Sequence, residues 1–241
     1  ENLNNHIGVP LTLLQLTEQH KIGIIEMGAN QLNEIRNLCE IALPNWGYIT
    51  NFGKAHLEGF GSEAGVIQGK SELYKHLQQH QGQILINGDD PKQLEQRKNH
   101  RVVQFGQGKE SDFKIEYLPS DGNHLELKFR EFFFKSPLYG SYNFSNLAAA
   151  VSFGALFEVP IKDIQKAIAK YDSENNRSQK LSIQGLQIIL DAYNANPSSM
   201  EVALRAFAKN QTENNAVILG DMLELGKQSE KEHEEMLSLC L

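Results

Sequence analysis

Short apolar runs alternate with amphipathic stretches along the first hundred residues of the chain. The apolar runs that predict buried strands are Lys21–Glu26, Gly47–Thr50, Gln83–Asn87 and Arg101–Phe105. In the stretches before and between them, apolar residues recur at helical spacing, which predicts helices over Pro10–Gln19, Asn33–Leu43 and Ser62–Gln78. Strands that alternate with helices are typical of an α/β domain with a largely parallel sheet.

The middle of the chain has a different pattern, in which strand-like segments follow one another without intervening helices. These segments are Asp112–Leu118, His124–Arg130 and Phe132–Leu138. Because their connections are short, they predict an antiparallel patch added to the edge of the parallel sheet. Two helices, Asn143–Phe157 and Ile161–Tyr171, are predicted next.

A polar, turn-prone segment at Asp172–Gln179 predicts a linker between two domains. Beyond this segment the alternation restarts, with strands predicted at Leu186–Asp191 and Ala216–Leu219 and helices at Pro197–Lys209 and Glu230–Leu239. We therefore expect one α/β domain over residues 1–176 and part of a second one over residues 177–241.

Composition and charge narrow the classes of function without identifying one. The 241 residues are 40% hydrophobic, which is enough to bury a core without disulfide cross-links. The net charge of −7 argues against a nucleic-acid-binding protein with a general basic surface. No apolar run approaches the ~18 residues of a membrane-spanning helix, so we expect no membrane insertion. Because the chain starts at Glu1 and stops at Leu241 inside an apparent helix, we expect it to be part of a longer protein.

Polar residues follow the predicted strands at the edge where α/β proteins bind ligands. Glu26 closes the first strand, His56 follows the second, and Lys70 lies in the next helix among small and apolar neighbours. Glutamate and histidine are plausible ligands for Mg²⁺ or Mn²⁺. Each residue alone also has an ordinary interpretation, as a solvated loop acid, a surface or capping histidine and a solvated lysine.

A second group of polar residues could contact a nucleotide. Asn143 and Asn146 open a helix on one face, where they either cap it or read an adenine edge. Arg177 lies in the predicted linker, either solvated or bound to a phosphate, and Asp191 ends a strand, either as part of a helix cap or as a nucleotide contact. The chain contains no Walker A sequence, so no segment of it alone is expected to cradle phosphates.

Eight short runs, in order along nearly the whole chain, resemble the Mur ligase family. They are NLNNHIGVPLT at 2–12, EMGAN at 26–30, TNFGKAHLEGFGS at 50–62, GKSEL at 69–73, NGDD at 87–90, GSYNFSNLAAA at 140–150, DAYNANPSSM at 191–200 and LGDMLELG at 219–226. Each run alone is a weak signal, whereas eight in family order are a strong one. The runs DAYNANP and LGDMLELG favour the branch of the family that adds D-alanyl-D-alanine over relatives that add other amino acids.

The resemblance implies a three-domain cytoplasmic enzyme of peptidoglycan precursor synthesis. Residues 1–176 would be its central ATP-binding domain without the P-loop, and residues 177–241 part of its C-terminal Rossmann-like domain. The implied reaction is ATP-dependent amide formation, in which D-alanyl-D-alanine is added to a UDP-N-acetylmuramoyl-tripeptide through an acyl phosphate. The implied cofactors are ATP and two Mg²⁺ ions. We expect a monomer.

The resemblance also implies roles for individual residues. It assigns Glu26, His56 and Lys70 to a second Mg²⁺, with Lys70 carbamylated by CO₂. It places Asn143 and Asn146 at the adenine, Arg177 at the transferred phosphate and Asp191 at the nucleotide. The residues implied to approach the muramoyl-peptide or dipeptide substrate are Asn4, Asn5, His6, Asn194 and Asn196.

Two positions depart from the family pattern. Tyr142 stands where the family often has histidine, and Asn33 stands where glycine often precedes the Glu-Ile pair. Neither belongs to the implied metal set, so the departures concern the shape of local loops.

Three alternatives remain open at this point. One is a metallohydrolase with a carbamylated lysine, although such enzymes usually carry a His-x-His pair and this chain has none. Another is a related ligase that glutamylates folate, against which the DAYNANP run argues. The third is a non-catalytic piece, since the chain alone, without a P-loop, is expected to show no turnover.

Overall fold

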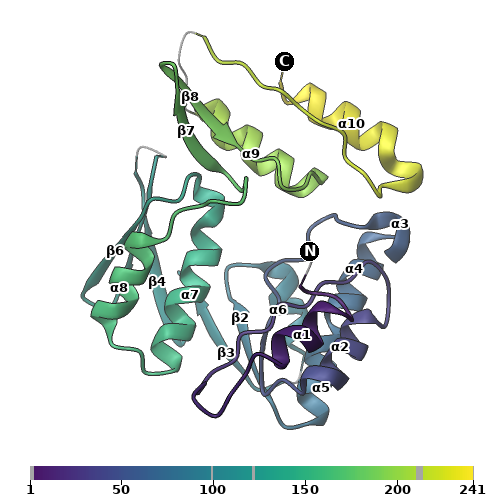
Figure 1. The fold of residues 1–241 in the computed structure, drawn as a ribbon, viewed down its shortest axis with the longest axis vertical. Helices are drawn as coiled ribbons and strands as arrows, with labels where there is room; N and C mark the ends of the chain where they lie inside the picture. Colours follow the sequence, from purple (N-terminus) through teal and green to yellow (C-terminus); the bar gives the residue numbers. More distant parts are fainter. Residues whose placement is uncertain (1–2, 99, 121–122, 210–213, 241) are drawn as a thin grey trace. The chain divides into compact units, whose positions relative to one another are not determined.

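A computed structural model describes residues 3–98, 100–120, 123–209 and 214–240 (Figure 1). The chain divides into two compact units. The first unit comprises Glu1–Ile86, Lys92–Val103 and Glu224–Gly226, and the second comprises Asn87–Pro91, Gln104–Leu223 and Lys227–Leu241. None of the helices in the described part of the chain is both long and apolar enough to cross a membrane.

The element order begins with alternating helices and strands. These elements are α1 (Gly8–Leu13), α2 (Glu34–Ala42), β1 (Trp46–Tyr48), α3 (Leu57–Phe60), α4 (Glu63–Lys70), α5 (Glu72–Gln79), β2 (Gln83–Asn87), α6 (Pro91–Arg97) and β3 (Val102–Gly106). Three strands follow in succession: β4 (Phe113–Leu118), β5 (Leu125–Phe129) and β6 (Phe132–Ser136). The remaining elements are η1 (Ser141–Asn143), α7 (Phe144–Leu156), α8 (Ile161–Lys170), β7 (Gln179–Ile183), β8 (Leu186–Leu190), α9 (Pro197–Lys209), η2 (Gly226–Gln228) and α10 (Ser229–Ser238).

The strands form a mostly parallel sheet with an antiparallel patch, as the sequence predicts. Its order is β1-β2-β3-β4-β5-β6. β1 pairs with β2 in parallel, with Trp46 opposite Gln83, and β3 pairs with β4 in parallel. β4, β5 and β6 form the antiparallel patch, and β7 and β8 make a separate antiparallel hairpin. The predicted linker therefore ends in a strand, β7, that the sequence analysis did not expect.

The core of the first unit is built where helix α5 covers the first two strands. Its buried residues are Ile49, Phe52, Tyr74, Leu77, Ile84 and Ile86. On α5, Tyr74 and Leu77 are three positions apart and so face the same side of the helix. In β2, a run of four buried residues shows that both faces of the strand are covered, which is typical of parallel sheets.

Two predicted strands do not form, and these predictions are wrong. Neither Lys21–Glu26 nor Ala216–Leu219 pairs with another strand in the part of the chain that the structure describes. Ile24 and Ile218 are 91% and 99% exposed. An apolar run supplies side chains suited to a strand, but a strand also needs a neighbour for its backbone hydrogen bonds.

The predicted helices form with shifted ends. The helix expected over Pro10–Gln19 is observed at Gly8–Leu13, and the one expected over Ser62–Gln78 is divided at Ser71 into α4 and α5. The helix predicted at Pro197–Lys209 is confirmed with those bounds.

The buried carboxylate of Glu72, at the start of α5, accepts hydrogen bonds from backbone amides at the beginning of α2. Its two oxygens accept hydrogen bonds from the backbone amides of Asn33 (2.8 Å) and Arg36 (3.0 Å). Asn33 has a left-handed backbone (φ 71°) and provides no side-chain cap. Glycine and asparagine both tolerate that conformation, which accounts for asparagine at this departure from the family pattern. The negative charge of the carboxylate also interacts favourably with the positive end of the α2 helix dipole.

We expect Glu72→Ala to lower the free energy of unfolding by about 3 kcal/mol, because it leaves amides at the start of α2 without acceptors. Glu72→Gln, which keeps one acceptor oxygen, should cost less. Urea denaturation measures both changes. The control is Glu40→Ala, which removes an exposed carboxylate 3.8 Å from Arg36 on the same helix and should cost less than about 1 kcal/mol. Equal losses for the alanine variants of Glu72 and Glu40 would contradict this account.

Candidate functional site

The three residues predicted to bind a metal all lie in the first unit, and each contacts a different partner. The Glu26 carboxylate accepts a hydrogen bond from the Asn4 amide at 2.9 Å. His56 Nδ1 pairs with a carboxylate oxygen of Glu224. Among the described residues, no group of three or more histidine, cysteine, aspartate or glutamate side chains forms a metal-binding cluster. The convergence of Glu26, His56 and Lys70 on one ion therefore stays a prediction.

Lys70, the third member, lies at the end of α4, where its side chain is half-buried. Its Nζ donates to the backbone oxygen of Asn51 at 2.8 Å, with the Asn51 side-chain oxygen at 3.4 Å. Burial lowers the pKa of Lys70 from 10.5 to about 8, because desolvation disfavours the charged form. A larger fraction of neutral amine is therefore present near neutral pH than on a surface lysine.

The segment around Asn4 is anchored to the residues near Glu26. The Gly28 amide donates to the Asn4 backbone oxygen at 2.7 Å. A Cβ at Gly28 would lie only 2.8 Å from the Asn4 amide group, so the close approach depends on glycine. Asn5 accepts from the amides of Ile7 and Gly8, and His6 is exposed. The predicted contacts of Asn4, Asn5 and His6 with a substrate remain predictions.

Glu224 is a residue that sequence reasoning missed. It is 168 positions from His56 in the sequence, and its backbone oxygen also accepts from the Glu58 amide at 3.0 Å. His56 has a left-handed backbone (φ 53°) at the start of α3. The LGDMLELG run marks the neighbourhood of Glu224, but no local pattern links it to His56.

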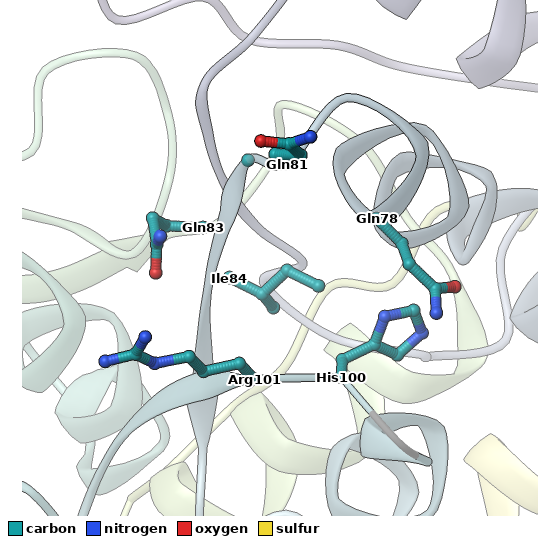
Figure 2. Close-up of a pocket in the computed structure, with 7 residues that line it drawn as sticks. Gln78, Gln81, Gln83, Ile84, His100 and Arg101 are labelled. Carbon is teal, nitrogen blue, oxygen red and sulfur yellow. The ribbon is translucent and has the colours of Figure 1, made fainter.

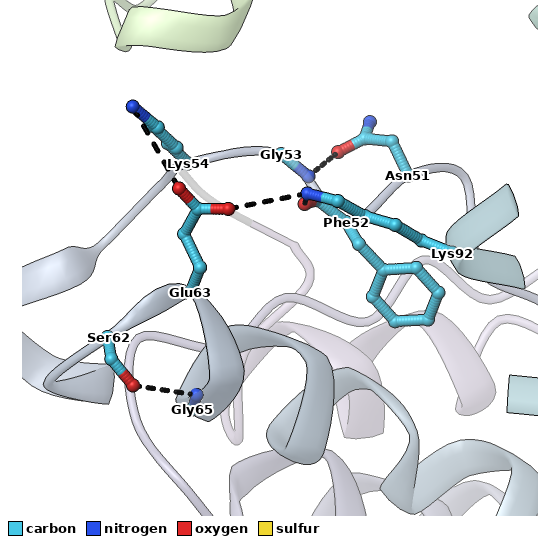
Figure 3. Close-up of polar contacts among 8 residues, drawn as sticks. All are labelled: Asn51, Phe52, Gly53, Lys54, Ser62, Glu63, Gly65 and Lys92. Atoms are coloured by element: carbon cyan, nitrogen blue, oxygen red, sulfur yellow. Dashed lines mark hydrogen bonds and ion pairs between the residues drawn. The ribbon is translucent and has the colours of Figure 1, made fainter. Parts of the chain in front are cut away.

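The segment after β1 is held by a network of charged side chains (Figure 3). Lys92 Nζ donates to the Phe52 backbone oxygen at 3.3 Å and lies 3.4 Å from a Glu63 carboxylate oxygen. Lys54 approaches the other Glu63 oxygen at 3.8 Å. Because Asn51 also holds Lys70, this network fixes the backbone beside that amine. No sequence motif predicts a role for Lys54, Glu63 or Lys92.

The residues predicted to contact the nucleotide lie in the second unit, and hydrogen bonds tie several of them together. The Asn146 amide donates to the Asn143 side-chain oxygen at 3.1 Å, and the Asn143 amide donates to the Tyr139 backbone oxygen at 2.9 Å. Tyr142 and Ser178 share a hydroxyl hydrogen bond of 2.7 Å. The Ser178 amide donates to the Asp191 carboxylate at 3.2 Å.

Tyr142, the second departure from the family pattern, thus joins the turn before α7 to the predicted linker. Burial is the main cause that raises its pKa to about 12, so the hydroxyl stays protonated. A protonated hydroxyl can donate to or accept from Ser178. The departure therefore replaces histidine with a group that makes a specific contact.

Arg177 lies against an aromatic ring in the same unit. Its Cζ is 3.8 Å from the centroid of the Tyr193 ring. Asn194 accepts from the Ala195 amide, and Asn196 caps α9 by accepting from the Ser199 amide at 3.0 Å. The predicted substrate roles of Asn194 and Asn196 stay predictions.

A cavity of about 250 Å³ in the first unit contains none of the predicted site residues (Figure 2). Its lining consists of Gln78, Gln81, Gly82, Gln83, Ile84, His100 and Arg101. The cavity lies where β2 begins, whereas Asn51, which accepts from Lys70, comes shortly after the end of β1, the parallel neighbour of β2. The predicted metal-binding and nucleotide-binding residues therefore lie outside this cavity, and their possible chemistry is inferred from their own hydrogen bonds and ion pairs.

Comparisons with known proteins agree on one family. The family model described as the Mur ligase middle domain matches residues 1–154, and the one described as the Mur ligase, glutamate ligase domain matches residues 176–240. The UDP-N-acetylmuramoyl-tripeptide–D-alanyl-D-alanine ligase of Bacillus subtilis (strain 168) is 34% identical over 238 residues, which cover 97% of this chain and 52% of that protein. The enzyme of the same name from Escherichia coli (strain K12) is 31% identical, covering 98% of this chain and 54% of that protein.

Solved structures show the same likeness. A crystal structure of MurF from Acinetobacter baumannii has a TM-score of 0.86 and 32% identity, covering 98% of this chain and 53% of that one. The MurF ligase of Thermotoga maritima, solved in complex with ADP, shares the fold with a TM-score of 0.80 at 24% identity, covering 99% of this chain and 56% of that one. The chain spans about half the length of the curated relatives it matches. By its two matching family models and its identity to these relatives, the chain belongs to the Mur ligase family.

Proposed function

We propose that this chain is the central and C-terminal part of an ATP-dependent ligase that joins D-alanyl-D-alanine to a UDP-N-acetylmuramoyl-tripeptide. The names of the relatives at 34% and 31% identity support this substrate pair over folate or a hydrolysable bond. In this proposal residues 1–176 belong to the central domain and residues 177–241 to the C-terminal domain. The enzyme would work in the cytoplasm as a monomer.

The observation that carries the proposal is the hydrogen-bonded group in the second unit. Tyr142, Ser178 and Asp191 connect the turn that bears the paired asparagines to the segment that bears Arg177. Amides that read adenine and a guanidinium that binds phosphate are the chemistry that an ATP site needs. Their fixed spacing would orient the nucleotide before reaction.

The proposed reaction has two steps. A substrate carboxylate attacks the γ-phosphate of ATP and gives an acyl phosphate and ADP. The amine of D-alanyl-D-alanine then attacks the acyl carbon, and phosphate leaves. Arg177 would stabilise the charge on the transferred phosphoryl group, which is an electrostatic contribution.

The donor atoms near Glu26 and His56 fit a divalent ion in their chemistry. Mg²⁺ commonly binds through one or two carboxylates together with substrate phosphates and water, so a protein cluster of three donors is not required. Glu26 and His56 would hold this ion, which would neutralise phosphate charge, and Lys70 would complete the set. The Glu224 carboxylate, beside His56, would orient the imidazole.

Carbamylation of Lys70 is the most demanding part of this proposal. Its lowered pKa supports reaction of the neutral amine with CO₂. In the structure the amine donates to the Asn51 backbone oxygen. Reaction with CO₂ leaves one N–H on the nitrogen, which can still donate there, so the new carboxylate oxygens would have to be directed at the ion while this contact is kept.

Arg177→Ala is expected to lower kcat for ligation by about 10²- to 10³-fold, as removal of a group that stabilises transition-state charge does. The Kd for ATP should rise much less. Phosphate release coupled to D-alanyl-D-alanine addition, measured in the full-length enzyme, gives kcat. The control is Arg205→Ala, which breaks an exposed ion pair with Glu201 in the same unit. Equal losses in kcat and ATP affinity would mean that Arg177 only binds the nucleotide.

Lys70→Ala should abolish most ligation in the full-length enzyme, and a short carboxylic acid that fills the space should restore part of it. Incubation with ¹³C-bicarbonate should give a carbamate resonance in the wild type that Lys70→Ala lacks. Normal activity in the variant, or no rescue together with no carbamate signal, would remove carbamylation from the mechanism.

The lowered pKa of Lys70 also predicts a pH dependence of stability. Lys70 titrates at about 8 in the folded chain and at ~10.4 in the unfolded chain. Between these values the unfolded state binds more protons, so the contribution of Lys70 to the free energy of unfolding rises with pH. The free energy of unfolding of the wild type minus that of Lys70→Met, measured by urea denaturation, should therefore rise between pH 7.5 and pH 10. Lys75→Met, which replaces an exposed lysine on α5, is the control for the loss of a surface charge.

A further inference from the structure

The backbone on both sides of Arg177 is fixed by hydrogen bonds within the second unit. The Asn176 carbonyl accepts from the amides of Ala192 (2.8 Å) and Tyr193 (3.2 Å). On the other side, the Ser178 amide donates to Asp191. Asn176 and Ser178 both have left-handed backbones, with φ of 53° and 51°. Arg177 therefore projects from a short turn that is bound to the segment carrying Tyr193.

The guanidinium of Arg177 stacks on the Tyr193 ring. An edge-on guanidinium with its Cζ 3.8 Å from the ring centroid would push a nitrogen inside van der Waals contact with the ring. The distance therefore favours an arrangement in which the two planes lie face to face. Such a stack attracts the cation through the ring face and uses none of its N–H groups.

The guanidinium N–H groups of Arg177 are available to bind an anion, because no carboxylate in the described residues forms an ion pair with them. Within the described ranges, no carboxylate forms an ion pair with Arg177, and Asp191 bonds to the Ser178 amide instead. A guanidinium donates hydrogen bonds in its own plane, in a fork that matches phosphate oxygens. The Tyr193 ring thus limits the rotation of the guanidinium while its edge remains open to an anion.

We propose that Tyr193 is a positioning residue that holds the Arg177 guanidinium flat, with its N–H edge directed at a phosphate oxygen of the nucleotide. The proposal rests on the proposed function for the identity of the anion. The ring face supplies the orientation, so phenylalanine should replace tyrosine at this position and leucine should not.

Nuclear magnetic resonance tests the stack without reference to activity. The side-chain Nε–H resonance of Arg177, assigned by its loss in Arg177→Lys, should be shifted upfield by the ring current in the chain. Tyr193→Phe should keep this shift, and Tyr193→Leu should abolish it. Tyr171→Leu is the matched control, because Tyr171 is 60% exposed in the same unit and Tyr193 is 54% exposed. A resonance that does not respond to Tyr193→Leu would overturn the stack.

Steady-state kinetics of the full-length enzyme test the positioning role. Tyr193→Leu should lower kcat for ligation by about 3- to 30-fold, the range that a cation–π contact supports. KM for ATP should change less than twofold, and Tyr193→Phe should behave as wild type. In an Arg177→Ala background, Tyr193→Leu should have no further effect, because the group that it positions is gone.

Three kinetic results for the Tyr193 variants would overturn the proposal. The first is wild-type kcat in Tyr193→Leu. The second is an equal defect in Tyr193→Phe, which would assign the role to the hydroxyl. The third is an additive loss in the double variant. If the wild-type enzyme shows the ring-current shift but no ATP-dependent ligation, the proposed function fails, and the positioning role fails with it while the stack stands. Thermal unfolding of each variant separates a folding defect from these outcomes.

Discussion

Backbone polar groups at helix ends and in turns need hydrogen-bond partners, and in this chain side chains from distant positions supply them. Glu72 accepts hydrogen bonds from two backbone amides at the start of α2, those of Asn33 and Arg36, which lie 39 and 36 positions away in the sequence. Asp191 accepts the amide of Ser178 in the same way. Because an unpaired buried backbone group is costly, these contacts determine where the loops run. The loops in turn carry most of the residues with candidate roles.

This constraint separates residues that serve the fold from residues that remain free to bind. Asn196 uses its side-chain oxygen to cap α9, so this oxygen has a structural partner within the chain. Arg177 is different: its backbone oxygen accepts from the Ser173 hydroxyl, but within the described chain its guanidinium lies against a ring face and forms no ion pair with a carboxylate, which leaves the guanidinium N–H groups open. The sequence motifs predict a binding role for each of these residues and do not distinguish between them. The structure distinguishes them by which atoms are already engaged.

The sequence predicts the elements whose cause is local and misses those whose cause is distant. The run QILIN is recognised as a short, unbroken apolar run that ends in turn residues, and the helix at Pro197–Lys209 by the helical spacing of its apolar residues. The run at Lys21–Glu26 has the same apolar character as QILIN, yet it pairs with no described strand. The pairing of His56 with Glu224, 168 positions away, has no local cause either. Periodicity reports side-chain burial, whereas pairing depends on the whole fold.

The two departures from the family pattern show how a motif can change while its physical requirement is met. At Asn33 the requirement is a left-handed backbone beside the amides that Glu72 binds, and asparagine meets it nearly as well as glycine. At Tyr142 the side chain reaches Ser178, whose amide is bonded to Asp191. A phenol reaches that position with a hydroxyl that stays protonated, so the contact does not depend on pH near neutrality. A histidine there would titrate in that range. Tyr142 therefore links the α7 turn to the Arg177 segment through a contact that does not titrate near neutral pH.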